Sequence, residues 1–354
     1  MAAVNIKLNP LGVFLILLGI SCVVFYAMGG MKWFQSEQKV SMKQLLAVGI
    51  DLAKRGGLRV KEIRESNRLN EKTKGLTEEG AKELKTEGDM QSHRAIVYGF
   101  AKAFPGLKVI SEEHERKPVD FKSIPDPTKQ LDEVDAVVGS DQMVPMKDIT
   151  VWIDPLDATQ EYTEDLTHFV TTMVCVAVKG VPMIGVIHQP FLKETAWAWV
   201  GYGFAKSLKV AKKEDRKDSD PYKIIVSRSH AGEVKAAATE SFGASTIVIP
   251  AGGAGYKTLA VIKGEADAYI HTTLIKKWDI CAGNALLHAV GGHMTTLDGT
   301  YIDYSSNLSE KNDKGLLASL YGYSTYRTKL ASIAEKMKKK EKPKEATKEA
   351  VKVL

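Results

Sequence analysis

The chain has 354 residues, of which 44% are hydrophobic and 8% aromatic, and it carries a formal charge of +6 at neutral pH. This is a globular composition with enough apolar residues for a large core, and it excludes a chain that is disordered throughout. Eight lysines and four glutamates in residues 331–354 supply +4 of that charge, so the rest of the chain gives little reason to expect nucleic-acid binding.

The first predicted element is an apolar segment at residues 11–29, which follows a short tail of residues 1–10. No charged residue lies between Lys7 and Lys32. Because a helix that spans a bilayer needs about 20 apolar residues, we expect a transmembrane signal-anchor, and a cleaved signal peptide is the alternative. The lysines on the two sides do not decide which end faces the cytoplasm.

Residues 36–205 are predicted to form an α+β half. Apolar spacing predicts a helix after Ser41 that Gly56 and Gly57 bend or break, and a second helix from about Asp89 to Phe104. A polar surface loop is expected from His114 to Lys147. Strands are expected at 107–111, 149–153, 170–178, 182–190 and 194–200, the last three as an antiparallel meander.

Residues 206–330 are predicted to form an α/β half, because strand and helix patterns alternate there. The lysine-rich residues 331–354 are expected as a frayed helix or a disordered tail. The three cysteines are too few and too scattered to indicate a disulfide framework, and buried free thiols are expected at Cys175 and Cys281.

Acidic residues stand at several predicted strand and helix junctions. Glu112 follows one strand, Asp154 and Asp157 follow another, and Asp89 and Asp279 open helices. Each alone is more often a helix cap, and Asp154 followed by Pro155 has the pattern of a helix start. Together they suit Mg²⁺, which prefers carboxylate and carbonyl oxygens. Two ions at such a site could hold a phosphate and activate water, which is the chemistry of phosphomonoester hydrolysis.

These residues carry a resemblance to a known family. Glu112-Glu113, "WIDPLDAT" at 152–159 and "WDICAGNAL" at 278–286 resemble the lithium-sensitive, magnesium-dependent phosphatases of the inositol monophosphatase superfamily. The stretches "DATQEYTEDL", "VSRSH" and "AGGAGYK" resemble the branch that hydrolyses 3'-phosphoadenosine 5'-phosphate (PAP) in the Golgi. The resemblance covers roughly residues 40–330 and implies an α/β fold, a layered αβαβα sandwich of the inositol monophosphatase and fructose-1,6-bisphosphatase type.

The resemblance also implies roles for individual residues. Two or three Mg²⁺ ions would be bound by Glu112, the Leu156 carbonyl and the carboxylates of Asp154, Asp157 and Asp279. The implied catalytic residues are Asp89, Thr159 and Glu112, and the implied substrate-binding residues are Ser227, His230, Gly253 and Lys257. A glycine-rich turn before a helix suits a phosphate, because the helix amides and dipole attract anions.

The function implied is that of a 3'(2'),5'-bisphosphate nucleotidase that converts PAP to AMP and phosphate without a covalent intermediate, in support of sulfation. The alternatives are an inositol monophosphate phosphatase and a catalytically silent membrane-anchored binding protein. The implied location is the Golgi membrane, with a single-pass type II anchor and a lumenal catalytic domain. Asn307-Leu308-Ser309 is a glycosylation sequon that such a location would allow to be used. The expected partners are the nucleotide and the membrane but no nucleic acid, and a homodimer is compatible with the resemblance.

Overall fold

The computed structural model describes residues 9–27, 38–76, 82–115, 119–213, 220–228 and 231–336. Contacts divide the chain into two compact units, Met1–Lys39 and Val40–Leu354. His230 and the lysine-rich residues 337–354 lie outside the described residues.

The N-terminal unit contains helix α1 (Pro10–Ala27). Among the residues that the structure describes, no helix is long and apolar enough to cross a membrane. The transmembrane anchor expected at residues 11–29 is therefore not supported.

The second unit contains two main sheets. The six-stranded sheet has the order β10-β9-β8-β7-β6-β4. Strands β6 to β10 pair antiparallel, which confirms the predicted meander, and β4 pairs parallel with β6 at the edge. Its strands are β4 (Lys108–Ser111), β6 (Ile149–Asp157), β7 (Thr171–Val178), β8 (Val181–Gln189), β9 (Glu194–Trp199) and β10 (Gly203–Phe204).

The five-stranded sheet has the order β12-β11-β13-β17-β15. Strand β11 pairs parallel with β12 and β13, and β17 pairs antiparallel with β13 and β15. The boundary predicted between residues 205 and 206 falls in the segment of chain that connects the last strand of the six-stranded sheet to the first strand of the five-stranded sheet. The strands are β11 (Lys223–Ser227), β12 (Ile247–Ala251), β13 (Ala268–His271), β15 (His293–Thr295) and β17 (Leu316–Ser319).

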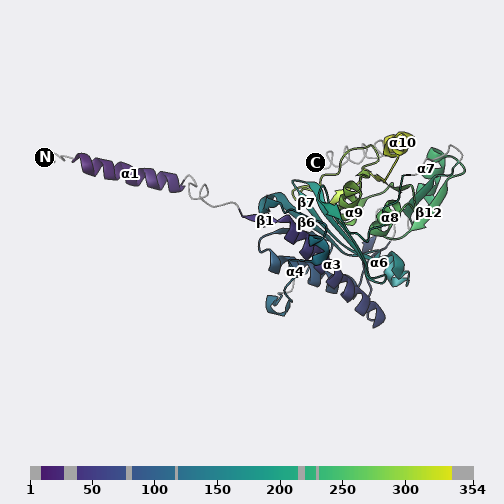
Figure 1. Cartoon of the computed structure of the whole chain (residues 1–354), viewed down its shortest axis with the longest axis horizontal. Coiled ribbons are helices and arrows are strands. Elements are labelled where there is room, and N and C mark those ends of the chain that lie inside the picture. The colour runs from purple at the N-terminus through teal and green to yellow at the C-terminus, as the bar shows by residue number, and fades with distance from the viewer. Residues whose placement is uncertain are drawn as a thin grey trace, which may run out of the picture. The chain divides into compact units, whose positions relative to one another are not determined.

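Helices cover both sheets in layers (Figure 1). Helices α3 (Met42–Glu65) and α4 (Glu87–Ala103) pack on one face of the large sheet, and α9 (Lys277–Ala289) packs on the other. Helix α8 (Ala254–Ile262) lies beside α9 and also contacts the small sheet, whose outer face carries α7 (Ala231–Phe242) and α10 (Tyr323–Lys329). This arrangement confirms the layered αβαβα sandwich.

Shorter elements connect these layers. They are β1 (Lys39–Ser41), β2 (Lys72–Leu76), β3 (Lys82–Lys85), η1 (Phe121–Ser123), α5 (Asp132–Asp135), β5 (Met143–Pro145), η2 (Met146–Asp148), α6 (Thr159–Thr163), η3 (Thr167–Phe169), β14 (Ile275–Lys276) and β16 (Lys311–Asn312). Several of them fall within the polar loop expected at 114–147. That expectation was wrong in part, because Val134, Val138 and Val144 of this segment are buried.

The break expected at Gly56 and Gly57 was also wrong, because α3 runs through both glycines. A Cβ atom at Gly56 would lie 2.6 Å from Ile96 of α4, and one at Gly57 would lie 2.4 Å from His188 of β8. The glycines therefore allow the helix to pack closely against two neighbours. Their cost in helix propensity, about 1 kcal/mol each, is offset by this tertiary packing.

A disulfide joins Cys175 of β7 to Cys281 of α9, so the expectation of two buried free thiols was wrong. The two cysteines are 106 residues apart, and their contact arises only because α9 lies directly on the large sheet. A Cβ at Gly185 of β8, the residue opposite Cys175, would lie 2.2 Å from the carbonyl oxygen of Ala282. Because Gly185 has no side chain, α9 can approach the sheet closely enough at this position for the disulfide to form.

Candidate metal-dependent active site

Three carboxylates from distant parts of the chain converge at one end of the large sheet. Glu112 follows β4, Asp154 lies in β6, and Asp279 is in the first turn of α9. Strands β4 and β6 are parallel neighbours with Ser111 opposite Ile153, which places Glu112 and Asp154 side by side. One oxygen from each of the three acids lies within 4.8 Å of the others, so the group could hold a metal ion.

The segment from Asp154 to Asp157 continues strand β6 and does not begin a helix, so the prediction of a helix start at Asp154 was wrong. Pairing with β7 shifts register between these two residues and then resumes with Asp157 opposite Thr171. Within this irregular stretch, the Leu156 amide donates to Asp154 Oδ1 at 3.1 Å. Helix α6 begins at Thr159, after Ala158 in the left-handed region at φ 71°.

The Asp157 carboxylate points toward the start of helix α8. It accepts hydrogen bonds from the Ala254 amide at 3.0 Å and from the Gly255 amide at 2.8 Å, both in the first turn of α8. The Thr171 hydroxyl also donates to it, at 3.1 Å. The positive end of the α8 dipole and two amides thus face a carboxylate of the chain itself. Asp157 lies outside the group of three acids, and its role as a metal ligand stays a prediction.

Burial and mutual repulsion dominate the electrostatics of the three converging acids. Burial, followed by the charges of neighbouring acids, raises the pKa of Asp154 and Asp279 well above the usual range. Burial also raises the pKa of Glu112, although the ammonium group of Lys74 opposes that rise. A divalent cation would relieve this repulsion, and three carboxylate oxygens are the donors that Mg²⁺ prefers. The residues present therefore fit Mg²⁺.

A lysine reaches this group from the hairpin of β2 and β3. Lys74 Nζ lies 2.8 Å from Glu112 Oε1 and also contacts Glu113, which pairs with Lys85 at 2.6 Å. Burial lowers the pKa of Lys74, but the two glutamates outweigh it and raise the pKa above the usual value. Lys74 is thus a protonated cation beside one edge of the carboxylate group.

Asp89 and Thr159 form a pair next to this group. The Thr159 hydroxyl lies 3.2 Å from Asp89 Oδ1 and 3.1 Å from the Leu156 carbonyl oxygen. Thr86 caps α4 and donates to Asp89 Oδ2 from both its amide and its hydroxyl. Burial raises the pKa of Asp89 to about 7, and the nearby charge of Glu112 contributes. A carboxyl group with this pKa can exchange a proton at neutral pH.

Three of the predicted substrate residues fall within the described part of the chain: Ser227 at the end of β11, Gly253 after β12 and Lys257 in α8. Ser227 ends β11 opposite Ala251, the last residue of β12. Gly253 precedes α8 at φ 61°, and a Cβ there would lie 2.8 Å from Asp157 Oδ2, so glycine suits both the backbone angle and the space. Lys257 is buried and donates to the Gly253 carbonyl at 2.5 Å, and burial lowers its pKa to about 8. Its ammonium group contacts the glycine loop itself.

Sequence reasoning missed Thr86, Lys74 and Thr171. The pattern Thr86-x-x-Asp89 is a helix-capping signature that could have identified Thr86. Lys74 and Thr171 reach the site from a hairpin and from a neighbouring strand, and their sequence contexts contain no such signature.

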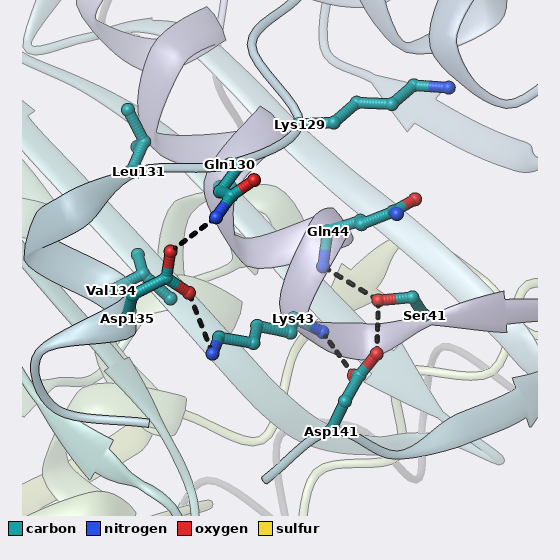
Figure 2. Close-up of a pocket in the computed structure, with 10 residues that line it drawn as sticks. Ser41, Lys43, Gln44, Lys129, Gln130, Leu131, Val134, Asp135 and Asp141 are labelled. Atoms are coloured by element: carbon teal, nitrogen blue, oxygen red, sulfur yellow. Dashed lines mark hydrogen bonds and ion pairs between the residues drawn. The ribbon is translucent and has the colours of Figure 1, made fainter. Parts of the chain in front are cut away.

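A polar pocket of about 210 Å³ lies at the start of α3, away from these residues (Figure 2). Its polar groups bind one another: the Ser41 hydroxyl donates to Asp141 at 2.6 Å, and Lys43 pairs with Asp135 at 2.7 Å. Ser41 also caps α3 by accepting from the Gln44 amide. The pocket contains none of the converging acids and has the contacts of a helix cap.

Comparison with known proteins gives matches over most of the chain. The model of the inositol monophosphatase family matches residues 41–339. "Inositol monophosphatase 3" of Danio rerio is 48% identical over 90% of this chain and 94% of its own length. "Golgi-resident adenosine 3',5'-bisphosphate 3'-phosphatase" of Rattus norvegicus is 46% identical over 90% of this chain and 95% of its own length.

Solved structures share the fold at low sequence identity. The structure of inositol monophosphate-bound SaIMPase-II has a TM-score of 0.60 at 15% identity, covering 84% of this chain and 99% of that one. CysQ from Bacteroides thetaiotaomicron has a TM-score of 0.54 at 21% identity, covering 79% of this chain and 99% of that one.

Proposed function

Because the chain belongs to the inositol monophosphatase family, whose members are magnesium-dependent phosphatases, we propose that it hydrolyses the 3'-phosphate of PAP to give AMP and phosphate. The observation that carries the proposal is the convergence of Glu112, Asp154 and Asp279 beside the pair formed by Asp89 and Thr159. The choice of PAP is supported by relatives named Golgi-resident adenosine 3',5'-bisphosphate 3'-phosphatase, which are 46–50% identical.

We propose separate roles for the two groups of residues. Glu112, Asp154 and Asp279, with Asp157 and the Leu156 carbonyl, would hold Mg²⁺, which when bound supplies a Lewis acid for the phosphate and lowers the pKa of water. The Thr159 hydroxyl would orient the attacking water, and Asp89 would accept its proton through that hydroxyl. No side chain forms a covalent bond with phosphorus in this scheme.

The substrate residues complete the proposal. Ser227 and His230 would contact the nucleotide, and the loop at Gly253 with Lys257 would receive a phosphate. Lys257 acts there by holding the loop carbonyls, because its ammonium group donates to Gly253.

A second candidate is hydrolysis of an inositol monophosphate, which is favoured by the 45–48% identity to relatives named inositol monophosphatase 3. Assays of phosphate release from PAP and from inositol 1-phosphate, at equal concentration and with Mg²⁺, separate the two. We expect kcat/KM for PAP to be at least about 10-fold higher, equivalent to about 1.4 kcal/mol. EDTA should abolish release and added Li⁺ should inhibit it. The opposite substrate preference would establish the inositol phosphatase, and no release from either substrate would indicate a silent binding protein.

We further propose that the catalytic unit lies in the Golgi lumen. Relatives named as Golgi-resident support this location. The disulfide between Cys175 and Cys281 also supports it, because disulfides persist in oxidising compartments and are rare in the cytosol. Asn307 of the sequon is exposed in a turn, where a glycan would be accepted without displacing the core.

A mobility shift tests the lumenal location. When the full chain is expressed in secretory-competent cells, an enzyme that removes N-linked glycans should increase its electrophoretic mobility by one glycan. Asn307→Gln and Ser309→Ala, which disrupt the sequon at different residues, should both abolish the shift. A wild-type chain that migrates the same with and without the enzyme would contradict use of the sequon.

A further inference from the structure

Three sequence stretches that resemble the PAP branch meet at one cluster of charges. "DATQEYTEDL" supplies Glu161 and Glu164, and "VSRSH" supplies Arg228. Arg228 Nη1 lies 3.1 Å from Glu161 Oε1, and Arg228 Nη2 lies 2.9 Å from Glu164 Oε2. The third stretch, "AGGAGYK", reaches the same cluster through Gly252.

Glu161 is the centre of this contact. Glu161 is only 7% exposed. A Cβ atom added at Gly252 would lie 2.4 Å from the carboxyl carbon of Glu161. The side chain therefore packs against the glycine loop while its carboxylate binds Arg228. The Arg228 amide also donates to the Ala251 carbonyl at 3.2 Å, which connects the arginine to the residue before the loop.

Helix α6 needs such anchors because it has only five residues. Helices this short are not stable alone, and α6 has no side-chain hydrogen bond at its N-cap. On one side, the Tyr162 hydroxyl donates to the Val60 carbonyl of α3 at 2.8 Å. On the other side, Arg228 connects the helix to β11 of the second sheet. The first residue of this helix is Thr159, whose hydroxyl binds Asp89.

We propose that Arg228 is a positioning residue for the phosphatase reaction, which it serves by holding α6 and the Gly252 loop in register through Glu161. The inference rests on the proposed function. Arg228 is unsuited to bind a phosphate directly. Its guanidinium lies between the carboxylates of Glu161 and Glu164, so the three side chains together carry a net charge of −1, which repels a phosphate. The paired carboxylates instead match the planar fork of the guanidinium, which lysine cannot reproduce.

The test compares Arg228→Gln with Arg228→Lys in the full chain, using the substrate that the wild type turns over fastest. We expect Arg228→Gln to lower kcat/KM about 10-fold, mainly through kcat, because Thr159 is displaced from Asp89. Arg228→Lys should restore part of the loss. Combining Arg228→Gln with Glu161→Gln should cost little more than either change alone, since both break the same contact.

Arg59→Gln is the matched control. Arg59 pairs with Glu62 at 2.8 Å in an exposed ion pair within α3. We expect it to leave kcat within about twofold of the wild type. Equal kcat values for Arg228→Gln and Arg59→Gln would overturn the proposal, as would additive losses in the double variant. If the wild type releases no phosphate from PAP, only the proposed substrate is contradicted. The role of Arg228 is still tested, because kcat of each variant is divided by kcat of the wild type on whichever substrate the wild type hydrolyses.

Discussion

Asp154→Asn is expected to abolish magnesium-dependent phosphate release and, at the same time, to raise the melting temperature of the metal-free protein. Asp154 is buried beside Glu112 and Asp279, and burial with their charges raises its pKa well above the usual range. Its ionised form therefore destabilises the folded state at pH 7 when no cation is bound. An amide of the same shape removes that charge and also removes a carboxylate that we propose as a metal ligand, so kcat should fall by at least about 100-fold.

Thermal unfolding in EDTA and in Mg²⁺ provides the measurement. In the wild type, a ligand present at about 100 times its Kd stabilises the fold by about 2.7 kcal/mol, so Mg²⁺ should raise the melting temperature. In Asp154→Asn this increase should disappear, and the EDTA value should exceed that of the wild type. Asp313→Asn, an exposed residue outside the site, should behave as the wild type does. Near-normal turnover by Asp154→Asn would refute the metal assignment.

The double variant Cys175→Ala with Cys281→Ala is expected to lose much of the stability of the catalytic unit. The disulfide closes a loop across 106 residues, and the chain-entropy model gives about 4.7 kcal/mol for a loop of about 100 residues. This loss should lower the melting temperature by on the order of 10 °C. Because Cys281 lies two residues after Asp279 in α9, the variant should also need more Mg²⁺ for half-maximal activity.

Cys22→Ala is the control, because Cys22 is a free, exposed thiol in α1 and should leave both measurements unchanged. Addition of a reductant should lower the melting temperature of the wild type and have no effect on the double variant. Detection of three free thiols in denatured, non-reduced protein would show that the disulfide is absent.

Local patterns predicted most of the fold. The strands at 170–178, 182–190 and 194–200 were recognisable because short apolar runs are separated by turn residues, and the structure pairs them in that order. The helix near Asp89 follows from its apolar spacing. Glu112, Asp154 and Asp279 were first grouped because each stands at a predicted strand or helix junction, and a family resemblance then implied that they bind metal. Nothing local shows that three acids so far apart in the chain converge.

The errors concern features that tertiary packing decides. Gly56 and Gly57 have low helix propensity, but close contacts with Ile96 and His188 keep α3 continuous. Asp154 before Pro155 has the local pattern of a helix cap, but pairing with β7 keeps it in a strand. The disulfide depends on how closely α9 lies on the sheet, which no periodicity in the sequence reveals.

The hydrogen bonds to Asp157 have an entropic consequence for ion binding. Its carboxylate accepts hydrogen bonds from two amides of α8 and from the Thr171 hydroxyl, all of them groups of the folded chain itself. Fixing a mobile side chain on binding usually costs about 0.5–1.5 kcal/mol. For Asp157 that ordering is already complete when the chain has folded. An ion that uses this carboxylate would therefore meet a preorganised ligand, and its affinity would depend on sharing the oxygens with α8.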